Sequence, residues 1–320
     1  MSGSEIFLQQ LIIGLSNGMI IALIALGYTM VYGIIELINF AHGDLFMLGS
    51  FAALTLVGLL GLDHLAAGAP GMWSGLFLML LIVPVFCGGL NWLADRFAYR
   101  HLRDSTKLAP LVSAIGLSFV FMNIGLLWGG VPMHVFGLGR SAASPKDFPA
   151  LVSNVNLLGQ SAVEFTTKDL MVFVVTLPLM VLLTWFVKGT RSGKAMRAVA
   201  QDRLAARLMG IPVDRVIGQT FLIGGALAGV ASVVSSVYNN TIYFQMGYRA
   251  GMDAFTAAVL GGIGSLPGAV LGGLVIGLAR AMCDQYLETR WTNVLVFTVL
   301  ILVLVFRPQG LLGARAKEKV

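Results

Sequence analysis

The sequence predicts an all-α polytopic membrane protein, a helix bundle with about eight membrane passages, one of them broken or re-entrant. Two observations support this fold class. The 320 residues are 57% hydrophobic and only 11% charged, whereas soluble domains carry about 25% charged residues. The chain also contains 39 glycines, and glycine is more frequent in membrane helices than in soluble ones. We therefore expect residues 1–320 to form a single transmembrane domain.

Eight apolar segments are close to the length of about 20 residues that a helix needs to cross a bilayer. The predicted passages are residues 8–36, 44–62, 75–95, 108–128, 169–187, 216–237, 253–282 and 292–306. The seventh is broken, because its centre reads GGIGSLPG, and glycine and proline at that density interrupt a helix. We expect two half-helices that enter and leave from the same side, with their irregular backbone covered by protein or by a water cavity.

The first passage is expected to stay in the protein, because the N-terminus has neither a basic region nor a small-residue cleavage site. Asn39, His42, Gly43 and Asp44 lie between the first two passages. Asp44 opens the second helix, where a carboxylate can cap free N–H groups and is stabilised by the helix dipole. We favour this capping role; a place on a pathway through the membrane or at a subunit contact is the alternative. The role of Glu36, the deeper acid, stays open.

Positive charges predict the orientation of the bundle. With the N-terminus outside, 15 of the 21 Lys and Arg fall inside: four in residues 96–107, seven in residues 188–215 and four after residue 306. Outside lie Arg140, Lys146, Lys168, Arg249, Arg280 and Arg290. Cytoplasmic loops of membrane proteins carry such an excess of Lys and Arg. The arrangement places a proline-containing loop, residues 129–168, outside and the C-terminus in the cytoplasm.

Residues 188–215 form the most basic loop, KGTRSGKAMRAVAQDRLAARLMGIPVDR. Residues 194–209 have high helix propensity. Four apolar residues in or near this helix fall at near-helical spacing: Met196, Val199, Ala200 and Leu204. One face of the helix could therefore dock on a partner while another face stays in water.

The sequence also predicts where this helix ends. Gly210 is expected to stop the helix, and Ile211-Pro212 begins an exit that cannot continue it. A loop of this size and order suits a membrane subunit that docks a soluble partner. A loop that only binds anionic lipid headgroups is the alternative, which explains the charge but not the ordered layout.

The broken passage contains further candidate residues. Asp253 is expected to cap the first half-helix, with Gly251 before it. Gly264, Pro267 and Gly268 lie in the break itself and are candidates for pathway or capping roles. Pairs of small residues four apart let helix backbones approach closely, and we expect most of them to serve bundle packing. They are Gly14–Gly18, Gly125–Gly129, Gly225–Gly229, Gly264–Gly268, Gly268–Gly272 and Gly273–Gly277.

Several other classes of site are excluded or disfavoured. Gly193-Lys194 does not form a phosphate-binding loop, because Lys188 stands where the first glycine is needed and Ala195 follows the lysine. No Ser/His/Asp or Cys/His constellation is visible, so we expect no catalytic residues and no enzyme activity. The histidines are scattered and the two cysteines lack CxxC spacing, so neither a metal site nor another cofactor is expected. The basic residues cluster beside apolar spans, which argues against nucleic acid as a partner.

Two motifs establish a family resemblance. Leu204-Ala205-Ala206, followed after three residues by Gly210-Ile211-Pro212, resembles the coupling loop of ABC-importer permeases, with Leu204 where the family pattern has an acid. Asn39-Phe40-Ala41-His42-Gly43-Asp44, with the runs at residues 260–269 and 306–311, is similar to permeases of branched-chain amino acid ABC importers of the LivH type. The coupling residues that this resemblance implies are Arg197, Asp202, Leu204, Ala205, Ala206, Gly210, Ile211 and Pro212.

The resemblance implies a bacterial inner-membrane permease that pairs with a second, homologous permease. Its other expected partners are two cytoplasmic ATPase subunits, an external (periplasmic) substrate-binding protein and membrane lipid. The implied solutes are branched-chain or other apolar amino acids. Two alternatives stay open: import of a related small solute such as an amide or urea, and an ion-coupled secondary carrier that uses an acid or histidine such as Asp44 or His42.

Overall fold

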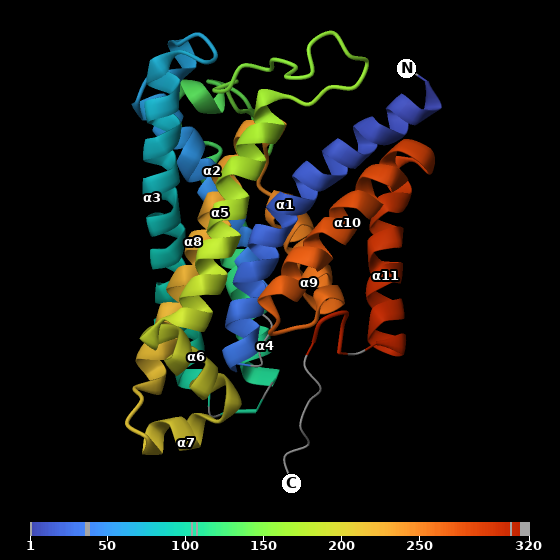
Figure 1. Cartoon of the computed structure of the whole chain (residues 1–320). Helices are drawn as coiled ribbons and strands as arrows, with labels where there is room; N and C mark the ends of the chain where they lie inside the picture. Colours follow the sequence, from blue (N-terminus) through green and yellow to red (C-terminus); the bar gives the residue numbers. More distant parts are fainter. Residues whose placement is uncertain (1, 36–38, 104, 107, 308, 314–320) are drawn as a thin grey trace.

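The computed structural model describes residues 2–35, 39–103, 105–106, 108–307 and 309–313, which form a bundle of long helices (Figure 1). Within these residues, eight helical segments are long and apolar enough to cross a membrane, which confirms the predicted fold class. They contain α1 (Gly3–Ile35), α2 (Ala41–Leu59), α3 (Pro70–Ala94), α4 (Leu108–Trp128), α5 (Thr167–Gly189), α8 (Val213–Asn239), α10 (Leu266–Tyr286) and α11 (Thr292–Phe306). Glu36 lies outside the described residues.

Shorter elements complete the fold. The third span continues through a π-helical turn, η2 (Asp95–Tyr99), and a 3₁₀ turn, η3 (Arg100–Leu102), and the last one begins with η5 (Thr289–Trp291). The other elements are η1 (Leu62–His64), η4 (His134–Phe136), β1 (Lys146–Asp147), α6 (Arg191–Gln201), α7 (Arg203–Leu208), β2 (Thr241–Ile242) and α9 (Met246–Gly261).

The bundle has two distinct ends (Figure 1). At one end, the N-terminus lies on the same side as the long connection between α4 and α5. This connection contains β1, which pairs antiparallel with β2 from the segment after α8. We call this the strand end. At the opposite end lie α6, α7 and the ends of α1 and α11. The chain thus places the predicted outer loop and the predicted coupling loop at opposite ends.

Helix α1 lies at the centre of the molecule and packs closely along α10 (Figure 1). Small residues make the crossing possible: a Cβ atom added to Gly277 would lie 2.3 Å from the Cα of Gly18, and one added to Gly14 would lie 2.9 Å from the Cα of Leu278. Gly225 and Gly229 let α8 approach α3 in the same way, at Cys87 and Pro84. The predicted packing role is confirmed for Gly14–Gly18, Gly225–Gly229 and Gly273–Gly277.

The broken passage consists of α9 and α10, which fold back on each other at the predicted Gly-Pro sequence. The first arm begins at Met246, seven residues earlier than the predicted 253. The expectation that Asp253 caps this arm is therefore wrong: Gln245 is the N-cap residue, and Asp253 lies inside α9, where its carboxylate accepts a hydrogen bond from the Arg280 guanidinium. A charged partner on the facing helix holds Asp253 in place.

Candidate functional site

The basic loop forms two helices at its end of the bundle. The hydroxyl of Thr190 accepts a hydrogen bond from the Gly193 N–H, which starts α6. The expected single helix over 194–209 is interrupted at Asp202, whose carboxylate accepts from the backbone N–H groups of Leu204 (2.8 Å) and Ala205 (3.0 Å) and starts α7. Aspartate satisfies helix N-termini better than helix interiors, so the chain turns sharply there.

Gly210 ends α7 as predicted. Its φ angle is +79°, and its N–H donates to the Arg207 carbonyl while the next N–H, of Ile211, donates to the Ala206 carbonyl. These two bonds form a Schellman motif, which satisfies the carbonyls at a helix C-terminus and requires a left-handed residue. Pro212 then precedes α8 directly. The sequence Ala205–Pro212 therefore fixes the angle between α7 and the membrane helix that follows.

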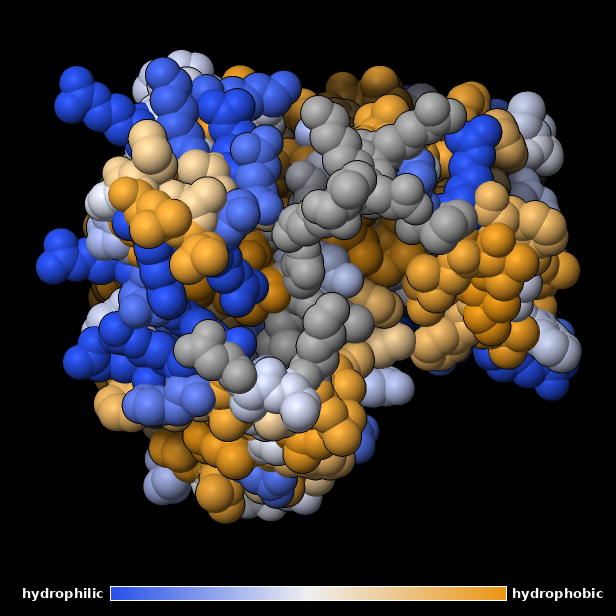
Figure 2. All heavy atoms as spheres, turned by 90° about the horizontal axis from the view of Figure 1, so that it is seen from below, coloured by the Kyte–Doolittle hydropathy of each residue, from blue (hydrophilic) through white to orange (hydrophobic). Residues whose placement is uncertain are grey.

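The apolar face of this segment is divided between two surfaces. Met196 and Val199 are buried, because α6 packs against α1, α5 and α8 of the same chain. The expectation that these two residues belong to a docking face is thus wrong. Leu204, Leu208 and Met209 are 69%, 82% and 82% exposed, and nothing in the described part of the chain covers them. Seen from this end, hydrophilic residues gather on the left around a small hydrophobic patch (Figure 2).

Two arginines fix the segment to the membrane helices. Arg203, at the start of α7, donates from one guanidinium nitrogen to the carbonyls of Ile34 (3.2 Å) and Ile35 (2.7 Å), in the last turn of α1. Arginine at a helix C-terminus satisfies free carbonyls and interacts favourably with the dipole. Arg197 donates to the Lys188 carbonyl at 3.3 Å. A displacement of α7 would therefore act on α1 directly.

Asn39 belongs to a buried hydrogen-bonded chain near the same end. Its side-chain oxygen accepts from the Tyr99 hydroxyl at 2.8 Å, and its amide nitrogen lies 3.4 Å from the Asn91 oxygen. Asn91 in turn donates to the Phe221 carbonyl at 2.7 Å. These contacts join the start of α2 to the third span and to α8, so Asn39 holds three membrane helices together.

His42, Gly43 and Asp44 are buried in a junction of α1, α2, α4 and α9. The His42 ring packs edge-on against Tyr28, with 4.7 Å between ring centroids. A Cβ atom on Gly43 would lie 2.3 Å from the Gly247 carbonyl oxygen. Asp44 lies in the first turn of α2 but makes no capping bond in this structure: Phe40 is the N-cap residue without a side-chain cap, and the Asp44 carboxylate accepts from the Ser118 hydroxyl instead. Asp44 therefore lies where the helix dipole stabilises a carboxylate, as predicted, but its side chain does not cap the helix.

The turn between α9 and α10 contains the other predicted candidates. Gly264 has a φ angle of +88°. Ser265 caps α10 by accepting from the Gly268 N–H at 3.2 Å, and Pro267 lies at the start of that helix. The C-terminal segment covers this turn, because the N–H groups of residues 311 and 312 donate to the carbonyls of residues 260 and 261. Two motifs far apart in sequence thus form one backbone junction.

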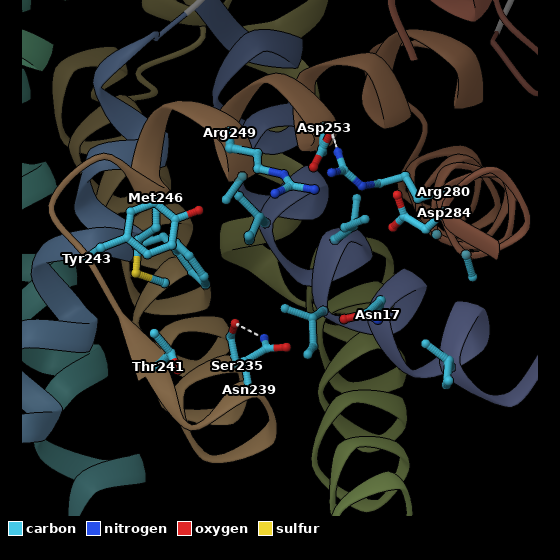
Figure 3. A pocket seen from close by; sticks show the side chains of 18 of the residues that line it. Asn17, Ser235, Asn239, Thr241, Tyr243, Met246, Arg249, Asp253, Arg280 and Asp284 are labelled. Carbon is cyan, nitrogen blue, oxygen red and sulfur yellow. Dashed lines mark hydrogen bonds and ion pairs between the residues drawn. The ribbon is translucent and has the colours of Figure 1, made fainter. Parts of the chain in front are cut away.

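A cavity of about 440 Å³ lies toward the strand end, where Thr241 of β2 lines it. Figure 3 shows the side chains around it. Its walls come from α1, the first turns of α2, the end of α8, β2 and the helices α9 and α10. The volume falls in the range of small-molecule sites, about 300–1,000 Å³. Its apolar residues include Ile20, Ile24 and Phe46, and its charged residues are Arg249, Asp253, Arg280 and Asp284.

Three of these charged residues, Arg249, Arg280 and Asp284, are not among the candidates predicted from the sequence. Arg249 and Asp253 are four apart on α9, and Arg280 and Asp284 are four apart on α10, so each pair lies on one helix face. Charged residues inside membrane segments are rare and usually face a partner or a water-filled cavity. The repeated Arg-x-x-x-Asp spacing could therefore have indicated a charged site inside the membrane segments. Only the fold shows that the two helix faces meet.

Comparisons with known proteins agree on one family. A family model described as "Branched-chain amino acid transport system / permease component" matches residues 10–304. The chain is 41% identical over 317 residues to the high-affinity branched-chain amino acid transport system permease protein LivH of Escherichia coli (strain K12), and 98% of each chain is covered. It is 42% identical over 320 residues to the corresponding permease protein BraD of Pseudomonas aeruginosa, again with 98% of each covered.

Among solved structures, PsaBC from Streptococcus pneumoniae in complex with Fab is similar with a TM-score of 0.46 and 14% identity, covering 95% of this chain and 92% of that one.

Proposed function

The chain belongs to the permease family of branched-chain amino acid transport systems, and from that membership we propose how it works. It is a multi-pass permease subunit of an ABC importer in the bacterial inner membrane, and ATPase activity belongs to partner subunits. The proposed solutes are branched-chain or other apolar amino acids, as in the relatives. The proposed assembly contains a second homologous permease, two ATPase subunits and an external binding protein.

The observation that supports coupling to an ATPase is the exposed surface of α7. Leu204, Leu208 and Met209 are largely exposed at the end of the bundle, among basic residues. A lipid-binding loop needs only the positive charges, whereas exposed apolar residues on and directly after a capped helix suit insertion into a protein groove. The groove would belong to the ATPase subunit.

The proposed transport cycle follows from the fixed points of this segment. ATP binding closes the two ATPases and moves α7. Arg203 transmits the motion to the last turn of α1, and Gly210 and Pro212 transmit it to α8. Both helices line the cavity near the strand end, so the motion changes access to it. In the proposed orientation the strand end faces outside and its loop at 129–168 docks the binding protein.

Purification of the tagged chain from its native membrane in mild detergent tests this proposal. Mass spectrometry should find two ATPase polypeptides and a second permease with the wild-type chain. A Leu208→Asn variant should retain roughly tenfold less ATPase, because truncating a central apolar contact costs more than about 1 kcal/mol in a typical interface.

The matched control is Leu59→Asn, a residue 70% exposed at the end of α2. Because it lies at the strand end, this variant should retain the ATPase as the wild type does. Equal loss in both variants, or a wild-type chain that purifies without any ATPase, would contradict the proposed docking surface.

A further inference from the structure

We propose that the cavity at the strand end binds a zwitterionic aliphatic amino acid during transport, with the carboxylate at Arg249 and Arg280 and the ammonium group at Asp284. The inference rests on the proposed function and deepens it by naming a solute site within this chain. It follows from two charged residues of the cavity, Arg249 and Asp284, that form no ion pair within the described part of the chain.

The four charged side chains converge from α9 and α10 on one wall of the cavity (Figure 3). Arg280 and Asp253 form an ion pair with each other across the two helices. Within the described residues, Arg249 and Asp284 form no ion pair, so one positive and one negative charge remain available. An amino acid zwitterion has one charge of each sign, and charge-complementary groups give a site its specificity.

Arg280 also has an unused donor. The residue is only 8% exposed, and one guanidinium nitrogen donates to Asp253 while Nη2 has no hydrogen-bond partner among the described residues. Buried polar groups in proteins are nearly always paired, and guanidinium groups suit carboxylates because several N–H groups point in fixed directions. Nη2 itself has less than 1 Å² of accessible surface, so a ligand carboxylate beside the Arg249 guanidinium would provide the missing acceptor once the side chains that cover Nη2 move during transport.

Asp284 is suited to the opposite end of the ligand. Its Oδ1 accepts a hydrogen bond from the neutral hydroxyl of Thr292, so the carboxylate is oriented but not neutralised. Ile20, Ile24 and Phe46 offer an apolar surface in the same cavity. An aliphatic side chain fits these residues, and an uncharged solute such as urea would use neither the free arginine nor the free aspartate.

The test measures binding to the purified importer complex without its binding protein and without ATP, by ligand-observed saturation-transfer NMR. Three probes are compared: leucine, leucinamide, which lacks the carboxylate, and 4-methylpentanoate, which lacks the ammonium group. The variants are Arg249→Gln and Asp284→Asn. Arg290→Gln and Glu288→Gln are matched controls, because both residues are exposed near the end of α10 and neither lines the cavity.

The proposal predicts a crossed pattern. Arg249→Gln should weaken leucine and 4-methylpentanoate binding by roughly tenfold or more and leave leucinamide binding unchanged, because each change removes the same contact. Asp284→Asn should weaken leucine and leucinamide but not 4-methylpentanoate. The two control variants should bind all three probes as the wild type does.

Equal loss of all three probes in Arg249→Gln, or no preference of the wild type for leucine over the two analogues, would overturn the inference. ATP-driven leucine uptake by the same preparations separates this failure from failure of the proposed function. Normal uptake in both cavity variants overturns the inference alone. Absence of uptake in the wild type overturns the proposed function, and the NMR pattern still decides the binding site because it needs no ATP.

Discussion

At the residue scale, Gly210 and Asp202 show how far local sequence determines the coupling segment. The helix stop at Gly210 could be predicted because its conformation depends on the chain immediately around it. The start of α7 after its N-cap residue Asp202 could not be predicted from the same sequence, since an aspartate inside a helix-prone stretch either caps a helix or points to solvent. The fold decides between these outcomes by turning the chain there.

Replacement of Gly210 should act through its backbone conformation and not through size. An added Cβ atom meets nothing within 4 Å, but the φ angle is +79°, and left-handed residues other than Gly and Asn cost roughly 1–2 kcal/mol. Gly210→Val should therefore lower ATP-driven uptake severely at normal expression, and Gly210→Asn should preserve most of it. Equal uptake by both variants in membrane vesicles would show that the Schellman turn is unnecessary.

The charged cavity residues mark the limit of sequence reasoning at this scale. The spacing of Arg249 to Asp253 and of Arg280 to Asp284 is visible in the chain. Arg280 pairs with Asp253 across two helices. Because this is a tertiary contact, it could not be predicted from the sequence, which instead suggested a capping role for Asp253. The free charges that remain could be identified only after that pairing was known.

At the element scale, the amphipathic pattern of α6 identified a buried face but not what buries it. Met196 and Val199 pack on the permease itself, whereas α7 presents the exposed apolar residues. Periodicity alone cannot distinguish an internal contact from a docking face, because both need the same apolar stripe. The role of Arg203 likewise could not be predicted from the sequence, since the carbonyls that accept its hydrogen bonds lie 168 and 169 residues away along the chain.

Loss of the Arg203 contact should uncouple ATP hydrolysis from transport. In Arg203→Gln the last carbonyls of α1 lose their charged donor, so α7 can move without moving α1. We expect normal recovery of the complex and ATPase activity near wild type, with uptake reduced roughly tenfold or more in proteoliposomes, because the variant loses two charge-assisted hydrogen bonds. Arg191→Gln, an exposed residue of α6, is the control. Parallel loss of hydrolysis and uptake would argue against a transmitting role.

The crossing of α1 and α10 should tolerate no added atoms. A Cβ atom on Gly277 would lie 2.3 Å from the Cα of Gly18, and overpacking of a tight core costs typically 1–3 kcal/mol. Gly277→Ala should lower the melting temperature of the purified chain in detergent. Gly116→Ala in α4 meets nothing within 4 Å and should be neutral or stabilising, because alanine favours helices by about 1 kcal/mol over glycine. Similar melting curves would contradict the packing described here.

At the scale of the whole molecule, most of the architecture could be predicted because membrane solvation imposes strong rules. Apolar length identified the spans, and the Gly-Pro sequence located the break between α9 and α10. Two features could not be predicted: the early start of α9, and the packing of residues 309–313 over its C-terminus. The second depends on backbone hydrogen bonds between segments that are distant in the sequence. The family motifs at both places now have a shared structural reason.

The predicted orientation can be measured on spheroplasts. The native cysteines Cys87 and Cys283 are buried, so new surface cysteines should react selectively. A membrane-impermeant maleimide should label Ser161→Cys, at the strand end, in intact spheroplasts, and Ser192→Cys, on α6, only after the membrane is opened. The positive-inside distribution requires this order, and the reverse order would invert the proposed topology.

The most direct measurement of the central claim is leucine uptake by proteoliposomes that contain the purified complex. The binding protein is supplied on the strand side and ATP on the α6–α7 side. We predict uptake that requires both, that stops with a non-hydrolysable ATP analogue, and that needs no ion gradient. Leucine movement by this chain alone, driven by an ion gradient without ATP, would contradict the importer assignment and identify a secondary carrier.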